Sequence, residues 1–117
     1  MSDMRNRPVM ESEGSAAQAN GQGGSALARA VTLHLDGKSR EALRELEHAI
    51  EEGDSPREVY SARGHIQFEL ELYEEAVKSY EALLELEPNA TSCYFNLAVC
   101  QEKLGRWAEA AANFERV

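Results

Sequence analysis

A pattern of small and bulky residues that repeats every 34 residues constrains the fold of this chain more than any other feature. It divides most of the sequence, without gaps, into three units: 23–56, 57–90 and the truncated 91–117. The eighth residue of each unit is small: Ala30, Gly64 and Ala98. The twentieth is always alanine, and the twenty-fourth is bulky: Leu46, Tyr80 and Phe114. A fixed period of this length is typical of a helical repeat array, in which small residues let paired helices approach closely.

Each unit contains two segments with helical spacing of apolar residues, and glycine follows three of these segments, as it commonly follows the last turn of a helix. Ser55 and Pro56 stand where an N-cap serine and a first-turn proline are expected. Ser39 and Asn89 are the expected caps of the second and fifth helices. We therefore predict an all-α, helix-turn-helix repeat solenoid. Its six expected helices cover approximately 25–35, 39–52, 56–70, 73–86, 90–104 and 107–117.

The units resemble tetratricopeptide repeats, whose 34-residue helix-turn-helix pattern combines aromatic, Leu-Gly, Ala, Phe and Pro positions. The third unit shows the best match, at Tyr94, Leu97, Ala98, Trp107, Ala110 and Phe114. In the second unit Arg63 replaces the usual leucine. In the first unit Ala26 occupies the aromatic position and Asp54 replaces the proline. The resemblance covers Gly23–Val117 and implies two and a half to three antiparallel helix pairs that bind other proteins.

The residues before the repeats have a different composition. The segment 1–22 is rich in Gly, Ser, Ala, Asn and Gln and lacks periodicity, so we predict a disordered tail. An alternative is that this tail folds back into the groove as an internal ligand. No run of eighteen apolar residues and no basic start followed by an apolar stretch occurs, so the cytoplasm is the expected compartment.

The formal net charge of the chain is −9, and more than half of this excess falls in the unit 57–90. Nucleic acid is a poor partner for such a chain, because phosphate binding needs clustered lysine and arginine. A basic partner is one interpretation of the acidic residues. The other is that they form the solvated outer faces of the helices.

The residue types that carry catalysis or bind metals do not form a recognisable site. Gly37–Ser39 resembles the end of a phosphate-binding loop, but Thr32 replaces the required earlier glycine and a helix replaces the required strand. The histidines lack a second ligand at helical spacing: His34, His48 and His65. Cys93 and Cys100 lie about 10 Å apart along one helix, too far for a disulfide. We therefore predict a non-catalytic protein without cofactor or metal.

The family resemblance implies that the first helix of each pair lines a concave surface. Positions 5, 9 and 12 of a unit share one helical stripe because they are four and three residues apart. With neighbouring polar positions, the predicted groove consists of Leu27, Val31, His34, His65, Phe68, Phe95, Asn96, Val99 and Glu102. An apolar strip edged by polar groups suits an extended peptide or an amphipathic helix. The alternative is that Phe68 or Phe95 packs against a neighbouring repeat.

Some family members hold the terminal carboxylate of a peptide with lysine and asparagine at positions 5 and 9 of one unit and with further basic residues in a later one. Leu27 and Val31 occupy the first two of these positions, and Asn96 alone matches the clamp. The sequence therefore does not predict a carboxylate-clamp co-chaperone.

The two ends of the array differ. Positions 3 and 10 of the first unit, which should face a preceding repeat, are Ser25 and Thr32, so the array is expected to begin there. Helix six stops before its last turn, and a polar capping helix is missing. We expect either a longer array or another molecule covering Phe114 and Val117. Self-assembly into a homo-oligomer is the alternative function. Trp107 is expected to pack across its helix pair.

Overall fold

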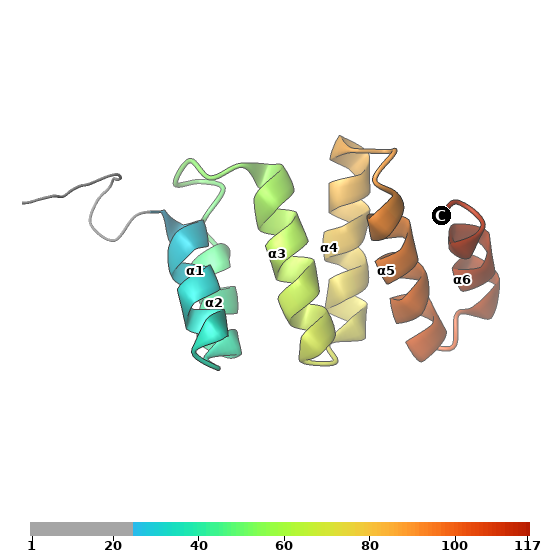
Figure 1. Cartoon of the computed structure of the whole chain (residues 1–117), viewed down its shortest axis with the longest axis horizontal. Coiled ribbons are helices and arrows are strands. Elements are labelled where there is room, and N and C mark those ends of the chain that lie inside the picture. Colours follow the sequence, from blue (N-terminus) through green and yellow to red (C-terminus); the bar gives the residue numbers. More distant parts are fainter. Residues whose placement is uncertain (1–24) are drawn as a thin grey trace, which may run out of the picture. The chain divides into compact units, whose positions relative to one another are not determined.

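The computed structural model describes residues 25–117, and the predicted tail 1–22 lies outside the described residues. Six α-helices occur in the described part, as the repeat pattern predicts (Figure 1). Their bounds are α1 Ala26–Leu35, α2 Ser39–Leu46, α3 Pro56–Glu69, α4 Tyr73–Leu86, α5 Thr91–Lys103 and α6 Trp107–Phe114. The all-α class is confirmed. None of the helices from residue 25 onward has the length and apolar character needed to cross a membrane.

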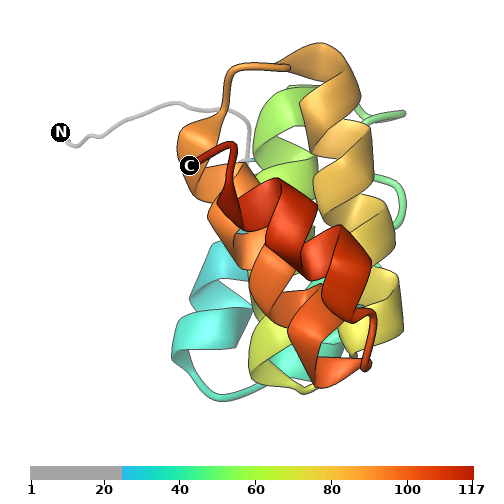
Figure 2. The same ribbon diagram turned by 90° about the vertical axis from the view of Figure 1, so that its right-hand side faces the viewer.

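The chain divides into two compact units between Asp54 and Ser55. The described part of the first unit is the pair α1–α2, and the second unit contains α3 to α6. Helices α3 and α4 form one antiparallel pair and α5 and α6 form another, and α4 packs on α5 to join the two pairs. Figure 2 shows α5 and α6 side by side, with α4 next to α5.

In the first unit, small residues let α1 and α2 approach closely. Ala30 and Ala42 are fully buried, as expected for positions 8 and 20 of the repeat. Asp54, which replaces the usual proline, accepts a hydrogen bond from the backbone N–H of Leu27 at 3.0 Å. That N–H belongs to the first turn of α1 and has no partner within the helix, so the carboxylate satisfies it and complements the helix dipole.

Helix α2 is shorter than predicted. It ends at Leu46 rather than near Glu52, and hydrogen-bonded turns follow it up to Gly53. Three glutamates in this segment oppose a longer helix, because negative charge is unfavourable at a helix C-terminus: Glu47, Glu51 and Glu52.

Two expected helix caps are also wrong. Lys38 is the N-cap of α2, and the hydroxyl of Ser39 instead lies 2.9 Å from Nδ1 of His34. Ala90, not Asn89, is the N-cap of α5.

The second unit is centred on the contact between Gly64 of α3 and Tyr80 of α4. A Cβ atom at Gly64 would lie only 2.8 Å from Cε1 of the Tyr80 ring. The ring is 3% exposed and joins a continuous apolar core: Ala76, Val77, Tyr80, Leu83, Cys93, Leu97 and Cys100. Burial raises the pKa of the Tyr80 hydroxyl. The pairing of a small residue at position 8 with a bulky one at position 24 is therefore the packing that the repeat pattern predicts.

Arg63, which departs from the family pattern, takes part in a polar contact between α3 and α4. Its Nε donates to Oγ of Ser79 at 3.1 Å, and that hydroxyl donates to Oε1 of Gln67 at 2.7 Å. Ser79 is 1% exposed, so these bonds satisfy a hydroxyl that water cannot reach. The guanidinium also lies over the ring of Tyr60, 5.1 Å from its centroid.

The other two helix pairs have polar contacts at equivalent positions of the repeat. In the first pair, Nε of Arg29 donates to Oε1 of Glu45 at 3.0 Å. In the third pair, Nδ2 of Asn113 donates to Oε1 of Gln101 at 2.8 Å. Position 23 thus provides a polar partner from the second helix of every pair, with a different side chain each time.

The turn inside each helix pair places one residue in the left-handed region of backbone conformation. Gly37 has φ 82° and Gly105 has φ 77°, but the equivalent residue of the repeat 57–90 is Glu71, with φ 63°. The residue after each of them donates to a carbonyl five positions earlier, as in a Schellman motif. Glu71 therefore occupies a conformation that favours glycine.

Candidate functional site

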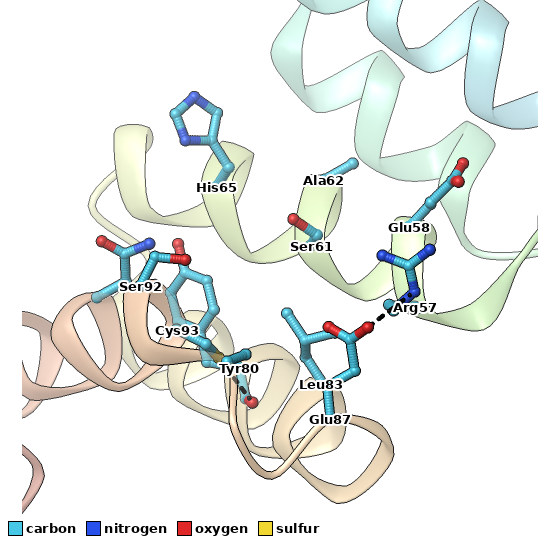
Figure 3. A pocket seen from close by; sticks show the side chains of 12 residues that line it. Arg57, Glu58, Ser61, Ala62, His65, Tyr80, Leu83, Glu87, Ser92 and Cys93 are labelled. Carbon is cyan, nitrogen blue, oxygen red and sulfur yellow. Dashed lines mark hydrogen bonds and ion pairs between the residues drawn. The ribbon is translucent and has the colours of Figure 1, made fainter. Parts of the chain in front are cut away.

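A pocket of about 510 Å³ opens in the second unit between α3 and α5, and the C-terminal half of α4 forms its base (Figure 3). We call it the α3–α5 pocket. Its lining comprises Arg57, Glu58, Ser61, Ala62, His65, Tyr80, Leu83, Glu87, Ala90, Ser92, Cys93 and Asn96. All twelve residues belong to one compact unit, so the packing of α3, α4 and α5 fixes their arrangement.

The base of the pocket is uncharged. Tyr80, Leu83 and Cys93 are buried members of the core of this unit. The Cys93 thiol donates a hydrogen bond to the carbonyl oxygen of Tyr80 at 3.3 Å. Burial, assisted by the nearby Glu87 carboxylate, raises the pKa of Cys93 to about 11. The thiol is therefore protonated near neutral pH and is not a nucleophile.

One end of the pocket carries an ion pair. Nε of Arg57, in the first turn of α3, lies 3.1 Å from Oε2 of Glu87 at the end of α4. Both side chains are about half exposed, so the pair contributes roughly 0.2–1 kcal/mol to stability. Glu58 is the next residue along α3 and is exposed at the same end.

The rest of the rim carries hydrogen-bonding side chains. Ser61 and His65 lie one turn apart on α3, and Ser92 and Asn96 lie one turn apart on α5. Nε2 of His65 also lies 2.8 Å from Oε2 of Glu69, one turn further along the same helix. Two facing rows of hydroxyl, imidazole and amide groups can bond the backbone of an extended chain placed between them.

The structure brings together only part of the predicted groove. His65 and Asn96 line the α3–α5 pocket. Phe68 is half-buried and packs edge-on against Tyr73, at a centroid distance of 5.7 Å, beside the core. Phe68 thus packs on Tyr73 of its own repeat, which is a different contact from the predicted alternative of packing against a neighbouring repeat. Phe95 is 48% exposed, but it lies outside the pocket.

The remaining predicted groove residues are distributed over both units. In the compact unit that contains α3 to α6, Val99 is half-buried and Glu102 is exposed, and neither lines the pocket. In the first unit, Leu27 and His34 are half-buried, whereas Val31 is 45% exposed.

Sequence reasoning missed the end of the pocket formed by Arg57, Glu58 and Glu87. A signal for Glu58 was available, because the stripe of positions 5 and 9 continues three residues earlier to position 2. Position 2 is Glu58 in the repeat 57–90 and Ser92 in the repeat 91–117, and both residues line the pocket. The loop residue Glu87 lies on no helical stripe and could not be found in this way.

A cluster of aromatic and apolar side chains is exposed on α5, α6 and the residues after α6. The rings of Phe95 and Phe114 pack edge-on with centroids 5.8 Å apart, and Val117 is 57% exposed. Trp107 was expected to pack across its pair, but its side chain is 66% exposed. It is the first residue of α6, so it lies at the end of the pair rather than between the two helices.

These helix pairs, with small residues at their contacts and a pocket beside the first helix of a pair, define an α-helical repeat protein. Residues 61–117 match a family model described as Tetratricopeptide repeat. Residues 61–117 therefore belong to the tetratricopeptide repeat family, as the sequence pattern predicts. No curated protein sequence matches the chain.

Among solved structures, one similar chain is described as the second TPR of Spaghetti (RPAP3) bound to the HSP90 peptide SRMEEVD. The two share 20% sequence identity, with a TM-score of 0.69 over 78% of this chain and 79% of that one. An identity this low relates the two proteins by fold alone.

Proposed function

We propose that this chain is a non-catalytic protein-interaction module and that the α3–α5 pocket binds an extended peptide segment of a partner protein. The observation that carries the proposal is the pocket itself, with an uncharged base and hydrogen-bonding groups along both sides. A peptide side chain can bury apolar surface on Tyr80 and Leu83 while its backbone bonds the polar groups of α3 and α5.

The chemistry of the pocket argues against catalysis. The Cys93 thiol is protonated near neutral pH and is engaged with a backbone carbonyl. The pocket is open along the helices, so water reaches the groups at its rim, and a reactive pair of side chains would lack the enclosure that shifts pKa values.

The solved relative supports the same mode of binding. Its description names a bound peptide, and its chain has the fold found here. Two of the residues predicted for the groove, His65 and Asn96, line the pocket, and we propose that they contact the peptide. Leu27, Val31, His34, Phe95, Val99 and Glu102 remain groove residues by repeat position alone.

The experiment compares two tryptophan substitutions after peptides have been selected from a random heptapeptide phage library on the immobilised chain. Ser61→Trp fills the α3–α5 pocket from α3, whereas Lys78→Trp adds the same side chain at an exposed position of α4 outside it. We expect Ser61→Trp to weaken binding of the selected peptides by about tenfold or more, or about 1.4 kcal/mol. Lys78→Trp should leave the affinity unchanged.

Fluorescence anisotropy measures the affinities, and circular dichroism verifies that both variants keep their helices. Equal affinity for the two variants would contradict the proposal, because the peptides would then bind elsewhere. Failure to select any peptide that discriminates between the variants would contradict it as well.

A second candidate function is self-association through the exposed cluster of Phe95, Phe114 and Val117. The rings of Phe95 and Phe114 are in contact, and Val117 follows three residues after Phe114, with its backbone N–H bonded to the Phe114 carbonyl. Phe95 and Val117 are each about half exposed, which favours contact with a second copy of the chain. Light scattering coupled to size exclusion, over a wide range of concentration, tests this function. A strict monomer at high concentration would rule it out, and Phe95→Glu should abolish any dimer observed.

A further inference from the structure

The charged side chains of the α3–α5 pocket lie together at one end, formed by the start of α3 and the end of α4 (Figure 3). Arg57, Glu58 and Glu87 lie there, away from His65. The Arg57 guanidinium is already paired with Glu87 at 3.1 Å. None of the described residues that line the pocket is a lysine. One cation and two carboxylates leave this end of the pocket with a net negative charge.

The two carboxylates remain accessible to a ligand. Glu87 is 43% exposed even though it is paired, and Glu58 is exposed in the first turn of α3. A carboxylate in the first turn of a helix, such as that of Glu58, complements the helix dipole. The uncharged base of the pocket provides no compensating charge.

The sign of this charge discriminates between ligands. A ligand carboxylate entering beside Glu58 and Glu87 would be the third at this end, and the nearby Arg57 is already paired with Glu87. A lysine or arginine at the same place would pair with Glu58 beside the Arg57–Glu87 ion pair, where the charge is net negative, and need not displace Arg57. Because the base consists of Tyr80, Leu83 and Cys93, a charged group would lose its hydration there and is favourable only at the rim.

Resting on the proposed function, we infer that the α3–α5 pocket is specific for a basic peptide segment. The segment places a lysine or arginine at the end formed by Glu58 and Glu87. Uncharged side chains lie over Tyr80 and Leu83, and the backbone is held by Ser61 and Asn96. This chemistry is opposite to that of the peptide named for the solved relative, SRMEEVD, in which two glutamates and one aspartate outnumber one arginine.

The heptapeptide selection tests this inference when its enriched sequences are compared between charge variants. On the unmodified chain we expect enrichment of lysine or arginine at one fixed position. Glu58→Gln removes one carboxylate and should weaken binding of the enriched basic peptides by about threefold to fivefold, the upper part of the range for an exposed ion pair. Glu58→Lys should weaken them further and should select peptides without the basic residue.

Glu85→Lys is the matched control, because it makes the same change in net charge at an exposed position of α4 outside the pocket. It should leave the affinity for basic peptides within about a factor of two if long-range attraction is screened at physiological salt. Thermal unfolding of each variant verifies folding, since Glu58 also complements the dipole of α3.

The two proposals fail in different ways. Selection of acidic or neutral peptides that still depend on Ser61 would overturn the basic specificity and leave the peptide-binding function standing. Equal weakening by Glu58→Lys and Glu85→Lys would also overturn it, because the attraction would then arise from net charge alone. Peptides insensitive to Ser61→Trp would refute the proposed function itself.

Discussion

The contact between Gly64 and Tyr80 predicts an unusual result, that replacing a helical glycine with alanine destabilises the chain. At an exposed helical site this substitution is favourable by about 1 kcal/mol. Here the new Cβ would lie 2.8 Å from Cε1 and 3.0 Å from Cδ1 and Cζ of the Tyr80 ring. The ring is buried and cannot move without displacing the core around it.

The expected magnitude follows from these opposing terms. Overpacking of this kind costs typically 1–3 kcal/mol, and the three short contacts place Gly64→Ala toward the upper end of that range. After the gain in helix propensity, a net loss of about 1–2 kcal/mol is expected. For a domain of this size the midpoint of thermal unfolding should fall by roughly 4–16 °C.

Urea unfolding followed by circular dichroism measures this loss. Tryptophan fluorescence is a poor probe, because Trp107 is 66% exposed in the folded chain. Tyr80→Leu removes the ring atoms that the new Cβ would meet. The loss in free energy of unfolding of the double variant should therefore be smaller than the sum of the two single losses by about 1 kcal/mol or more. Ser61→Ala, at an exposed position of α3, is the control and should be close to neutral. A Gly64→Ala variant as stable as the parent would refute the packing described here.

Two further predictions concern the backbone of Glu71 and the buried thiols. Glu71→Gly should stabilise the chain by about 0.5–1 kcal/mol, because φ 63° favours glycine. Gly105→Ala, at φ 77°, should destabilise it by about 1 kcal/mol. Urea unfolding measures both changes, and a Glu71→Gly variant less stable than the parent would contradict the left-handed conformation of Glu71. Burial raises the pKa of both Cys93 and Cys100 from 9.0 to about 11, so their contribution to stability is complete below pH 9 and is lost as the pH rises toward 11. Unfolding free energies measured between pH 8 and pH 11 should decline over that window in the parent, and a Cys93→Ala, Cys100→Ala double variant should show a smaller decline.

The sequence predicted the fold well because helix pairing depends on residue size at fixed intervals. Gly64 and Tyr80 occupy equivalent positions to Ala98 and Phe114, and a one-dimensional pattern contains that information. The end of α2 was predicted less well, because the turns that follow Leu46 depend on local hydrogen bonds and on charge at the helix end rather than on periodicity.

The candidate site was only partly predictable for a physical reason. A helical stripe identifies residues that share a face, so His65 was found, and Asn96 was found at a polar position next to that stripe. It does not show whether a side chain on that face leans into a neighbouring helix, as Phe68 does toward Tyr73. It also misses groups contributed by a helix end, such as Glu87, because their position depends on how the chain leaves the helix.

The different polar side chains at position 23 have a consequence for how the helices choose their partners during folding. Repeats with identical contacts can exchange helices, and such mispairing is a characteristic failure of repeat proteins. Here α5 carries Leu97 where α1 carries Arg29, so α5 docked on α2 would replace the charged Arg29–Glu45 pair with, at best, a hydrogen bond from the neutral Gln101 amide to Glu45. The polar contact thus favours the correct partner helix, while the small and bulky residues common to all three pairs provide the packing between helices.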